Sequence, residues 1–427
     1  MSETNGSRAS LARRLGTTTA TLLTAGMIIG TGIFGATGSA ASKAGSGILL
    51  AMVLGGLVAL FTGISAVQLG VNYPEEGGAF TWARKFNHRR LGFVAGTAYL
   101  GKGIFSLSVI SLAFAEYTTQ IVSGIPAPLL AACAIIAIIF VNMFSVHLTA
   151  RVVIGLLAVN VTLFATYVGL SAPSVNLSHY GNPIGENGLV GLFAGTALFF
   201  WTWDGFMRTA IMAGEIKEPR RTIPVAVIGG IALAAIVFLI VGAVTLGVLG
   251  PVSIGADNVP LYRAGVQTAG AIGGIVVLLT AWTASVTELI GDMLAASRVA
   301  YTMGEAAEIP KWLGAIQPKQ NVPRNAVLAI GLLVAGLVLL FDLRRLLAVA
   351  SVFTLVWYII THYSATRLSK RQRLTTPLFT YLGLAGCALL FVSLPLLAIL
   401  AGLGVLFAAT IIREVAVYRR QNNCEKK

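Results

Sequence analysis

Long apolar segments alternate with short polar clusters along almost the whole chain. A helix needs roughly 20 apolar residues to cross a bilayer. Proline, glycine and charge clusters mark the turns between such segments. The pattern predicts an all-α integral membrane protein with about 12 transmembrane helices. The predicted spans lie near residues 18–41, 47–70, 92–122, 127–146, 148–171, 189–213, 223–249, 271–297, 325–341, 346–366, 376–394 and 396–416.

Composition points to the same class. Of the 427 residues, 56% are hydrophobic and 11% are charged, whereas soluble domains carry about 25% charged residues. The net charge of +14 is of a size that nucleic-acid and membrane-surface proteins show. The basic residues are nevertheless scattered between apolar segments and do not form one face. We therefore expect the lipid bilayer as the surroundings of the chain and no nucleic acid as a partner.

The distribution of basic residues predicts the orientation. With spans that alternate in direction, 25 Lys and Arg residues lie on the side of the termini, 4 lie on the other side, and Lys102 lies within a span. Cytoplasmic loops carry the excess of Lys and Arg in membrane proteins. Both termini are therefore expected in the cytoplasm, with the chain in the cell (plasma) membrane. The first apolar run is too long for a signal-peptide core, so the first helix should be retained.

Cysteine and histidine indicate no metal site. The three cysteines show no CxxC spacing, and the four histidines lie at or near the ends of predicted loops without ligand spacing. Cysteines within apolar segments usually serve packing. We expect no metal, no cofactor and no disulfide.

The stretch from Thr24 to Ser39 carries five glycines inside an apolar run. Each glycine weakens a helix by about 1 kcal/mol relative to alanine. Unwound backbone is tolerated at bilayer depth only where protein or a water-filled cavity satisfies its polar groups. We interpret the Gly30-Thr31-Gly32 segment as a break that forms half of a substrate site. Gly26 and Gly30 also form a GxxxG pair, for which close helix packing is an alternative meaning.

A second interruption is expected about half a chain further on. The segment from Phe199 to Ala210 places Asp204 and Gly205 within another apolar run. Paired interruptions in corresponding positions of two halves are typical of transporters built from inverted repeats.

Four motifs in order resemble the amino acid, polyamine and organocation (APC) permease superfamily. They are GMIIGTGIF, YPEEGGAFTWARKF, GEIKEPRRTIP and ASRVAYTMGEAAEIPKWL. The resemblance implies a leucine-transporter-type fold of two inverted five-helix repeats, in which helices 1 and 6 are broken. It divides the chain into a cytoplasmic tail (1–17), a first repeat (18–171), a second repeat (189–366), two further helices (374–416) and a C-terminal cytoplasmic tail (417–427).

The first break suits a carboxylate. Unwinding exposes the N–H groups of the following half-helix, and Thr31, Gly32 and Ile33 are best placed to donate them. Carbonyl groups on the other side of the break can accept an ammonium group or a cation. An α-amino acid carries both charges, so a zwitterion fits such a site.

The second break contributes the segment Trp201, Thr202, Trp203, Asp204 and Gly205 to the predicted site. The resemblance implies that Trp201 stacks over the substrate as a thin gate, whereas Trp203 could face lipid. Asp204 needs a partner, because an ionised carboxylate at the centre of a membrane helix costs about 2.5 to 3.5 kcal/mol. Arg208, four residues on, and a substrate ammonium remain alternative partners.

Candidates for ion coupling lie on three segments. Gly26 and Ile29 belong to the first break. The resemblance implies that Asn160 stands where some proton-coupled members carry a lysine. Glu288 and Asp292 lie one turn apart on one helix face. Two carboxylates so close resist double ionisation, so one of them would hold a proton near neutral pH. Pairing with Lys102, or with each other, is the alternative.

Together these features predict a secondary active transporter. We expect it to move a small amino acid or organic amine across the cytoplasmic membrane by alternating access, as a proton-coupled symporter. An inorganic monovalent cation transporter on the same fold, an amino acid exchanger and a non-transporting sensor are the alternatives. No catalytic residue is assigned and no enzyme is expected, since the spans show no pairing of a nucleophile with a base. No obligate protein partner is evident.

Overall fold

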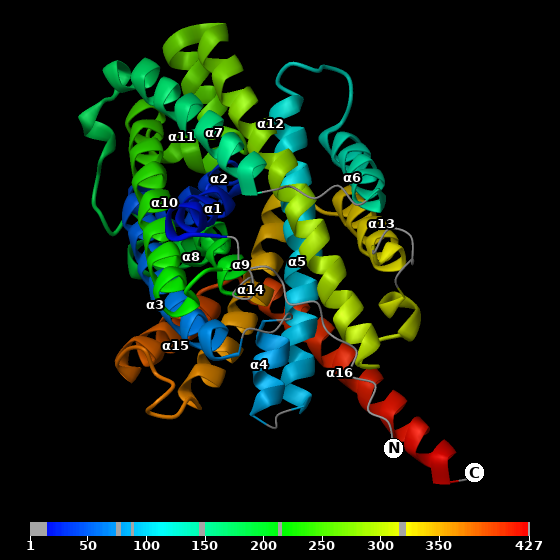
Figure 1. Cartoon of the computed structure of the whole chain (residues 1–427). Coiled ribbons are helices and arrows are strands. Elements are labelled where there is room, and N and C mark those ends of the chain that lie inside the picture. The colour runs from blue at the N-terminus through cyan, green and yellow to red at the C-terminus, as the bar shows by residue number, and fades with distance from the viewer. Residues whose placement is uncertain are drawn as a thin grey trace.

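The computed structural model describes residues 15–73, 78–86, 89–144, 150–211, 216–315 and 322–425. Residues 1–14 of the predicted N-terminal tail and residues 426–427 of the C-terminal tail lie outside this part. Helices fill most of it, and the predicted all-α class is confirmed. Within the described residues, each predicted span coincides with one helix or a pair of helices (Figure 1).

The first half of the chain begins with a helix in two parts. These are α1 (Thr17–Ile28) and α2 (Gly32–Ala44), with three residues between them. The helices that follow are α3 (Ile48–Asn72), the short α4 (Ala79–Lys85), α5 (Arg89–Thr118), α6 (Ala127–Met143) and α7 (Ala150–Ser171).

The second half again begins with an interrupted helix. Its parts are α8 (Gly188–Phe200), the 3₁₀ turn Trp201–Trp203 and α9 (Phe206–Ile211). The helices that follow are α10 (Pro219–Leu249), α11 (Pro251–Ala256), α12 (Pro260–Glu305), α13 (Arg324–Leu340), α14 (Leu343–Thr366), α15 (Pro377–Val392) and α16 (Leu396–Glu425). Both interrupted helices are thus where the glycine pattern and the second apolar run predict them. The relation of the two halves by inverted repetition stays a prediction.

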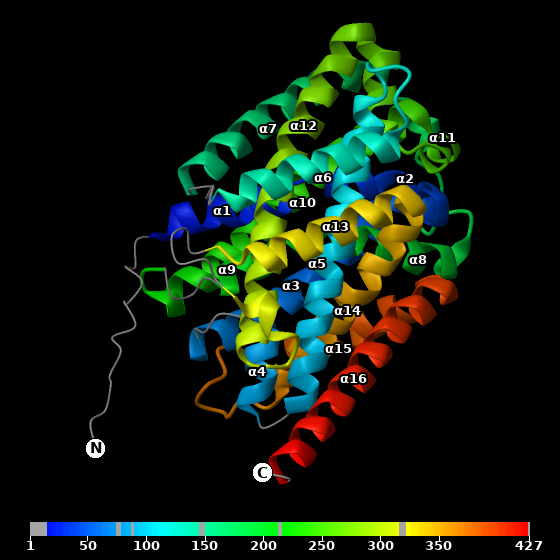
Figure 2. The ribbon, with the colours of Figure 1, turned by 90° about the vertical axis from the view of Figure 1, so that its right-hand side faces the viewer.

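Length and hydropathy support a membrane setting. In the described residues, seven helical segments are long and apolar enough to span a bilayer, and shorter apolar helices cover 127–143, 188–203, 324–340 and 377–392. Figure 2 shows α9 and α4 on one side of the bundle and α8 and α11 on the opposite side. By the predicted orientation, the side of α4 and α9 is cytoplasmic.

The segment after α10 lies over α2. The backbone of α12 leaves helical geometry at Ala269 and at Gly270, whose φ is +56°. This kink separates an initial helical piece from the long span that follows. Helix α11 packs against α2. Arg344 of α14 ties the segment down by donating to the carbonyl of Gly255 at 2.8 Å and to the side chain of Asn258 at 3.2 Å.

A buried carboxylate joins four segments at the predicted cytoplasmic side. Glu308, just after α12, binds Arg413 of α16 at 2.6 Å, Arg89 of α5 at 3.0 Å and Arg84 of α4 at 3.4 Å. Burial raises the pKa of Glu308, but the hydrogen bonds and charges of Arg413 and Arg89 outweigh it, so this pKa lies below its usual value. Helix α16 continues to Glu425, past the end at 416 that its hydropathy predicts. The partner that Glu308 gives Arg413 explains how a charge is accommodated in that helix.

A polar cluster lies between α3, α14 and α15. His362 is fully buried, and its ring nitrogens lie 3.1 Å from the Thr62 hydroxyl and 3.0 Å from the Ser65 hydroxyl. Ser65 in turn donates to Thr380 at 3.3 Å. His362 thus lies near the end of α14, as predicted, but its ring is buried among hydroxyl groups of α3, which its apolar flanks in the sequence do not reveal. His88 and His147 lie outside the described residues.

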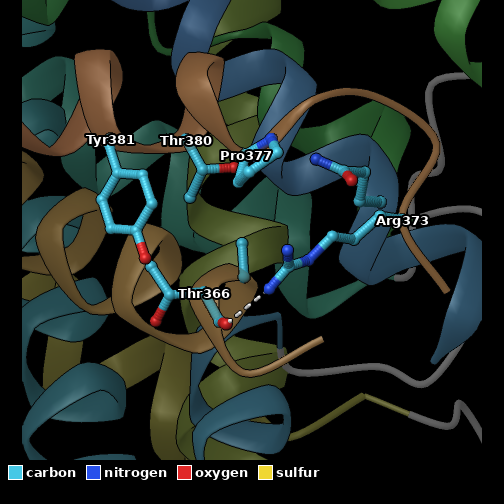
Figure 3. Close-up of a pocket in the computed structure, with 7 residues that line it drawn as sticks. Thr366, Arg373, Pro377, Thr380 and Tyr381 are labelled. Atoms are coloured by element: carbon cyan, nitrogen blue, oxygen red, sulfur yellow. Dashed lines mark hydrogen bonds between the residues drawn. The ribbon is translucent and has the colours of Figure 1, made fainter. Parts of the chain in front are cut away.

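A small pocket opens next to this cluster at the ends of α3, α14 and α15 (Figure 3). Thr380 lies in its wall, and Arg373 donates to the carbonyl of Thr366 at 3.3 Å. Gln68 closes another side and accepts a hydrogen bond from the N–H of Leu374 at 3.1 Å. The polar groups of Arg373 and Gln68 are hydrogen-bonded to backbone groups beside the pocket. We therefore interpret the pocket as a gap in the packing where three helix ends meet.

Candidate substrate site

The first break is three residues long. Helix α1 ends with the N–H of Ile29 donating to Ala25 at 2.8 Å, and the N–H of Gly30 donates to Ile28 at 2.8 Å. Helix α2 then begins at Gly32, with Thr31 as the residue before it. The first N–H groups of a helix have no carbonyl partner within it. The role of the N–H groups of Thr31, Gly32 and Ile33 toward a substrate stays a prediction.

The second break is tighter than a fully unwound segment. One 3₁₀ turn, Trp201–Trp203, links α8 to Asp204 and Gly205 before α9 starts. The connecting hydrogen bonds are long: 3.3 Å from the N–H of Asp204 to Trp201 and 3.4 Å from the N–H of Arg208 to Gly205. The change of helix type redirects the side chains on either side of it.

The two breaks lie directly against each other. A Cβ atom built on Gly32 would lie 2.9 Å from the Cα atom of Thr202, and one built on Gly205 would lie 2.6 Å from the backbone nitrogen of Ile28. Real Cβ atoms do not approach backbone so closely, hence only glycine fits at either position. The structure thus brings the two predicted half-sites together, although they are far apart in the chain.

Asp204 has partners on two other helices. Its carboxylate forms an ion pair with Lys102 of α5 and accepts a hydrogen bond from the Tyr358 hydroxyl of α14. The proposed pairing with Arg208 is not the one that forms, because Asp204 precedes α9 and the spacing of four does not span a regular helical turn. Arg208 instead pairs with Asp292 of α12.

Glu288 and Asp292 have different partners. Asp292 faces Arg208, whereas Glu288 accepts a hydrogen bond from the N–H of Thr31 at 2.7 Å. The Thr31 hydroxyl lies 3.2 Å from that of Ser285, so α12 contacts the first break twice. The alternative pairings, with Lys102 or with each other, are also absent among the described residues. One face of a helix can meet different neighbours within a single turn, which residue spacing does not reveal.

The two tryptophans have different environments. Trp201 is 4% exposed and donates from its indole nitrogen to Ser106 of α5 at 2.7 Å. Trp203 is 1% exposed and packs edge-on against Phe238, with ring centroids 5.1 Å apart. The expectation that Trp203 could face lipid is therefore wrong. Between them Thr202 is buried, and among the described residues its hydroxyl has no hydrogen-bond partner.

The other predicted ion-coupling residues lie along α1 and α7. Gly26 packs on α7, where a Cβ atom would lie 3.3 Å from Val153 and 3.4 Å from Leu157. Asn160 accepts a hydrogen bond from Thr283 of α12 at 2.5 Å. Ile29 lies buried in the first break. Close packing thus accounts for Gly26, and the ion-coupling role of the three residues stays a prediction.

From the sequence, Lys102 is expected only as a partner of Glu288 or Asp292, and no role is assigned to Tyr358. Lys102 is 3% exposed on α5. A lysine within an apolar span is expensive unless it is paired, so its presence was a signal of a buried carboxylate nearby. A tyrosine in a span carries no such signal, because its ring packs readily in an apolar core.

The amino acid permease family model matches residues 19–419. The chain belongs to the amino acid permease family. The permease is 30% identical over 414 residues to an uncharacterized transporter of Mycobacterium tuberculosis (strain ATCC 25618 / H37Rv), covering 96% of this chain and 93% of that protein.

Two named transporters are also similar to the permease. The branched-chain amino acid permease BcaP of Bacillus subtilis (strain 168) is 25% identical over 387 residues, covering 85% of this chain and 82% of BcaP. The chloroplastic cationic amino acid transporter 7 of Arabidopsis thaliana is 28% identical over 364 residues, covering 79% of this chain and 62% of that transporter. With the apolar helices, these matches show a multi-pass membrane transporter of the amino acid permease family.

Proposed function

We propose that the permease is a secondary active transporter that carries a small amino acid or organic amine across the plasma membrane by alternating access, with both termini in the cytoplasm. The observation that carries this proposal is the direct contact of the two breaks, Gly32 against Thr202 and Gly205 against Ile28. Secondary transporters typically bind substrate and coupling ions at interrupted helices near the middle of the membrane.

The first break supplies the carboxylate side of the site. The N–H groups of Thr31, Gly32 and Ile33 open α2, and the positive end of its dipole favours a carboxylate by up to about 2 kcal/mol. Gly32 has no side chain, so Thr202 of the second break packs directly on its backbone beside these donors.

The second break supplies polar groups for the other end of an amino acid. The Thr202 hydroxyl is buried and has no partner among the described residues, so it can bind a substrate group without breaking a contact. The Asp204 carboxylate is fixed by Lys102 and Tyr358 at the same break. The indole ring of Trp201 lies between the second break and α5, where it is held by its hydrogen bond to Ser106. Bulky aromatic walls favour a small substrate.

Glu288 is the proposed proton carrier. Asp292 is engaged by Arg208, which leaves Glu288 as the carboxylate that touches the break itself. One charge that moves down a potential of 100 mV yields about 2.3 kcal/mol. This free energy supports roughly fiftyfold accumulation of a neutral zwitterion.

A thermal-shift screen of the purified permease against amino acids, amines and monovalent cations tests the proposal. A ligand at about 100 times its Kd stabilises the folded protein by about 2.7 kcal/mol. We expect at least one amino acid or amine to raise the melting temperature, and counterflow in proteoliposomes to move the same compound. Stabilisation by inorganic cations alone would favour the cation transporter instead. Binding without flux would favour a sensor.

A further inference from the structure

The carboxylate of Glu288 already lies where the substrate carboxylate is expected. Its Oε2 atom accepts the N–H of Thr31 at 2.7 Å. A Cβ atom built on Gly30 would lie 2.5 Å from that oxygen and 2.8 Å from Cδ. The carboxylate therefore lies directly on the backbone of the first break, and Glu288 comes from α12, outside both breaks.

Of the ionisable side chains around the two breaks, Glu288 is the one that the ion pairs leave over. Five ionisable side chains surround the breaks, and the two cations are each paired: Lys102 with Asp204, and Arg208 with Asp292. Glu288 is left with the Thr31 N–H as its hydrogen-bond donor, under the field of Arg208 and Lys102. Tyr358 of α14 is a further titratable group beside the second break, and its hydroxyl donates to Asp204. Tyr99 of α5 lies under Lys102, whose Nζ is 5.5 Å from the centre of the Tyr99 ring. Glu288 is the one carboxylate there without an ion-pair partner among the described residues.

We infer that Glu288 is a built-in competitor for the carboxylate of the substrate, and that a proton releases it from the first break. This inference rests on the proposed function, since it takes the substrate to be an amino acid bound at Thr31. As an anion Glu288 holds the N–H of Thr31. As a neutral acid it gives up that donor, and the substrate carboxylate replaces it.

Physical chemistry links the two events. Two carboxylates cannot share one N–H donor in a low dielectric, because like charges repel strongly there. If Glu288 left the break as an anion, it would become a buried charge without its donor, which is costly. It therefore leaves as the neutral acid, with a proton taken from the side that admits the substrate. One proton enters with one carboxylate, and both depart together on the other side.

The inference predicts that the effect of pH on binding depends on the ligand, whereas an effect of pH on the stability of the protein would be the same for every ligand. A substrate with a carboxylate needs Glu288 to move, whereas an uncharged carboxamide in its place does not compete for an anion position. Proton-linked binding should therefore be a property of the free amino acid and should vanish in its amide.

The test measures, on the purified permease, the Kd of L-alanine, L-leucine and L-arginine and of their three amides between about pH 4.5 and pH 7, below the titration of their α-amino groups at about 7.7 to 8.0. Above the titration of Glu288, the Kd of the bound amino acid should rise about tenfold per pH unit, as one linked proton requires. The Kd of the amides should stay flat. In Glu288→Gln the Kd of the amino acid should also become flat.

Glu116→Gln is the matched control, because Glu116 is a partly buried carboxylate at the end of α5 that accepts a hydrogen bond from Asn258 at 3.4 Å. It should keep the pH dependence. The comparison of acid with amide needs no variant, so it holds even if Glu288→Gln folds poorly. Amino acids that bind with a Kd independent of pH, or that titrate as their amides do, would overturn the inference and leave the proposed function intact. Binding of none of the six compounds at any pH would overturn both.

Discussion

Lys102 of α5 and Asp204 of the second break form an ion pair in the interior of the bundle, with exposed fractions of 3% and 8%. The Tyr358 hydroxyl donates to the same carboxylate. A hydrogen-bonded pair of this kind can be neutral in net free energy, whereas the loss of one partner leaves a buried charge. The pair and the Tyr358 hydrogen bond therefore tie α5 and α14 to the second break.

Lys102→Met should destabilise the permease by about 3 to 5 kcal/mol, because it strands the charge of Asp204. The double variant Lys102→Met with Asp204→Asn should regain most of that loss, since both charges are then gone. Thermal unfolding in detergent measures both. A double variant no more stable than Lys102→Met alone would show that the pair is not the source of the effect.

Gly32→Ala should weaken substrate binding at least tenfold, or about 1.4 kcal/mol. Its Cβ atom would enter the backbone of Thr202 and push the two breaks apart. Gly35→Ala is the matched control on the same helix, where a Cβ atom would meet Ala113 at an ordinary 3.5 Å. The measurement is the Kd of both variants for the ligand that the thermal-shift screen identifies. Equal affinities in the two variants would remove the contact of the breaks from the site.

Trp201→Ala should mainly weaken substrate binding, whereas Trp203→Ala should mainly lower the stability of the fold. Trp203 fills the core beside Phe238, so its loss should cost about 3 to 5 kcal/mol of stability. Trp201 borders the second break, so its loss should weaken binding by about 0.5 to 1.5 kcal/mol beyond the burial effect. Melting temperature and Kd separate the two. A larger loss of affinity in the Trp203 variant would show that the gate residue is misassigned.

Glu308 should make the stability depend on pH at the acidic side. Its pKa in the folded protein lies below the unfolded value of about 4.3, so its contribution is present above that pH and disappears as the pH falls through the folded pKa. Glu308→Gln should destabilise at neutral pH by about 3 kcal/mol, since Arg413 loses its buried partner. It should also flatten the acid limb of a stability curve. An unchanged acid limb would exclude Glu308 as its source.

The fold was predictable because its signals are local. Apolar length predicts spans, and the glycines around Thr31 predict a break, since both act through the backbone of their own segment. Family membership follows from motifs in order. The interruption at Asp204 and Gly205 was likewise predictable from a charge and a glycine inside an apolar run.

The partners within the site were not predictable, because they depend on which helix faces meet. Asp204 was expected to meet Arg208 and meets Lys102 instead, since a 3₁₀ turn precedes α9. Glu288 and Asp292 share a helix face but contact Thr31 and Arg208 respectively. Such contacts join segments far apart in sequence, and one chain alone holds no record of them.

The most direct test of the proposed function is uptake into proteoliposomes that contain the purified permease, with the amino acid found by thermal shift. An imposed pH gradient, acidic outside, should drive accumulation of that amino acid without sodium, and Glu288→Gln should retain exchange while it loses this accumulation. Uptake that follows an imposed sodium gradient and ignores the pH gradient would contradict proton coupling through Glu288.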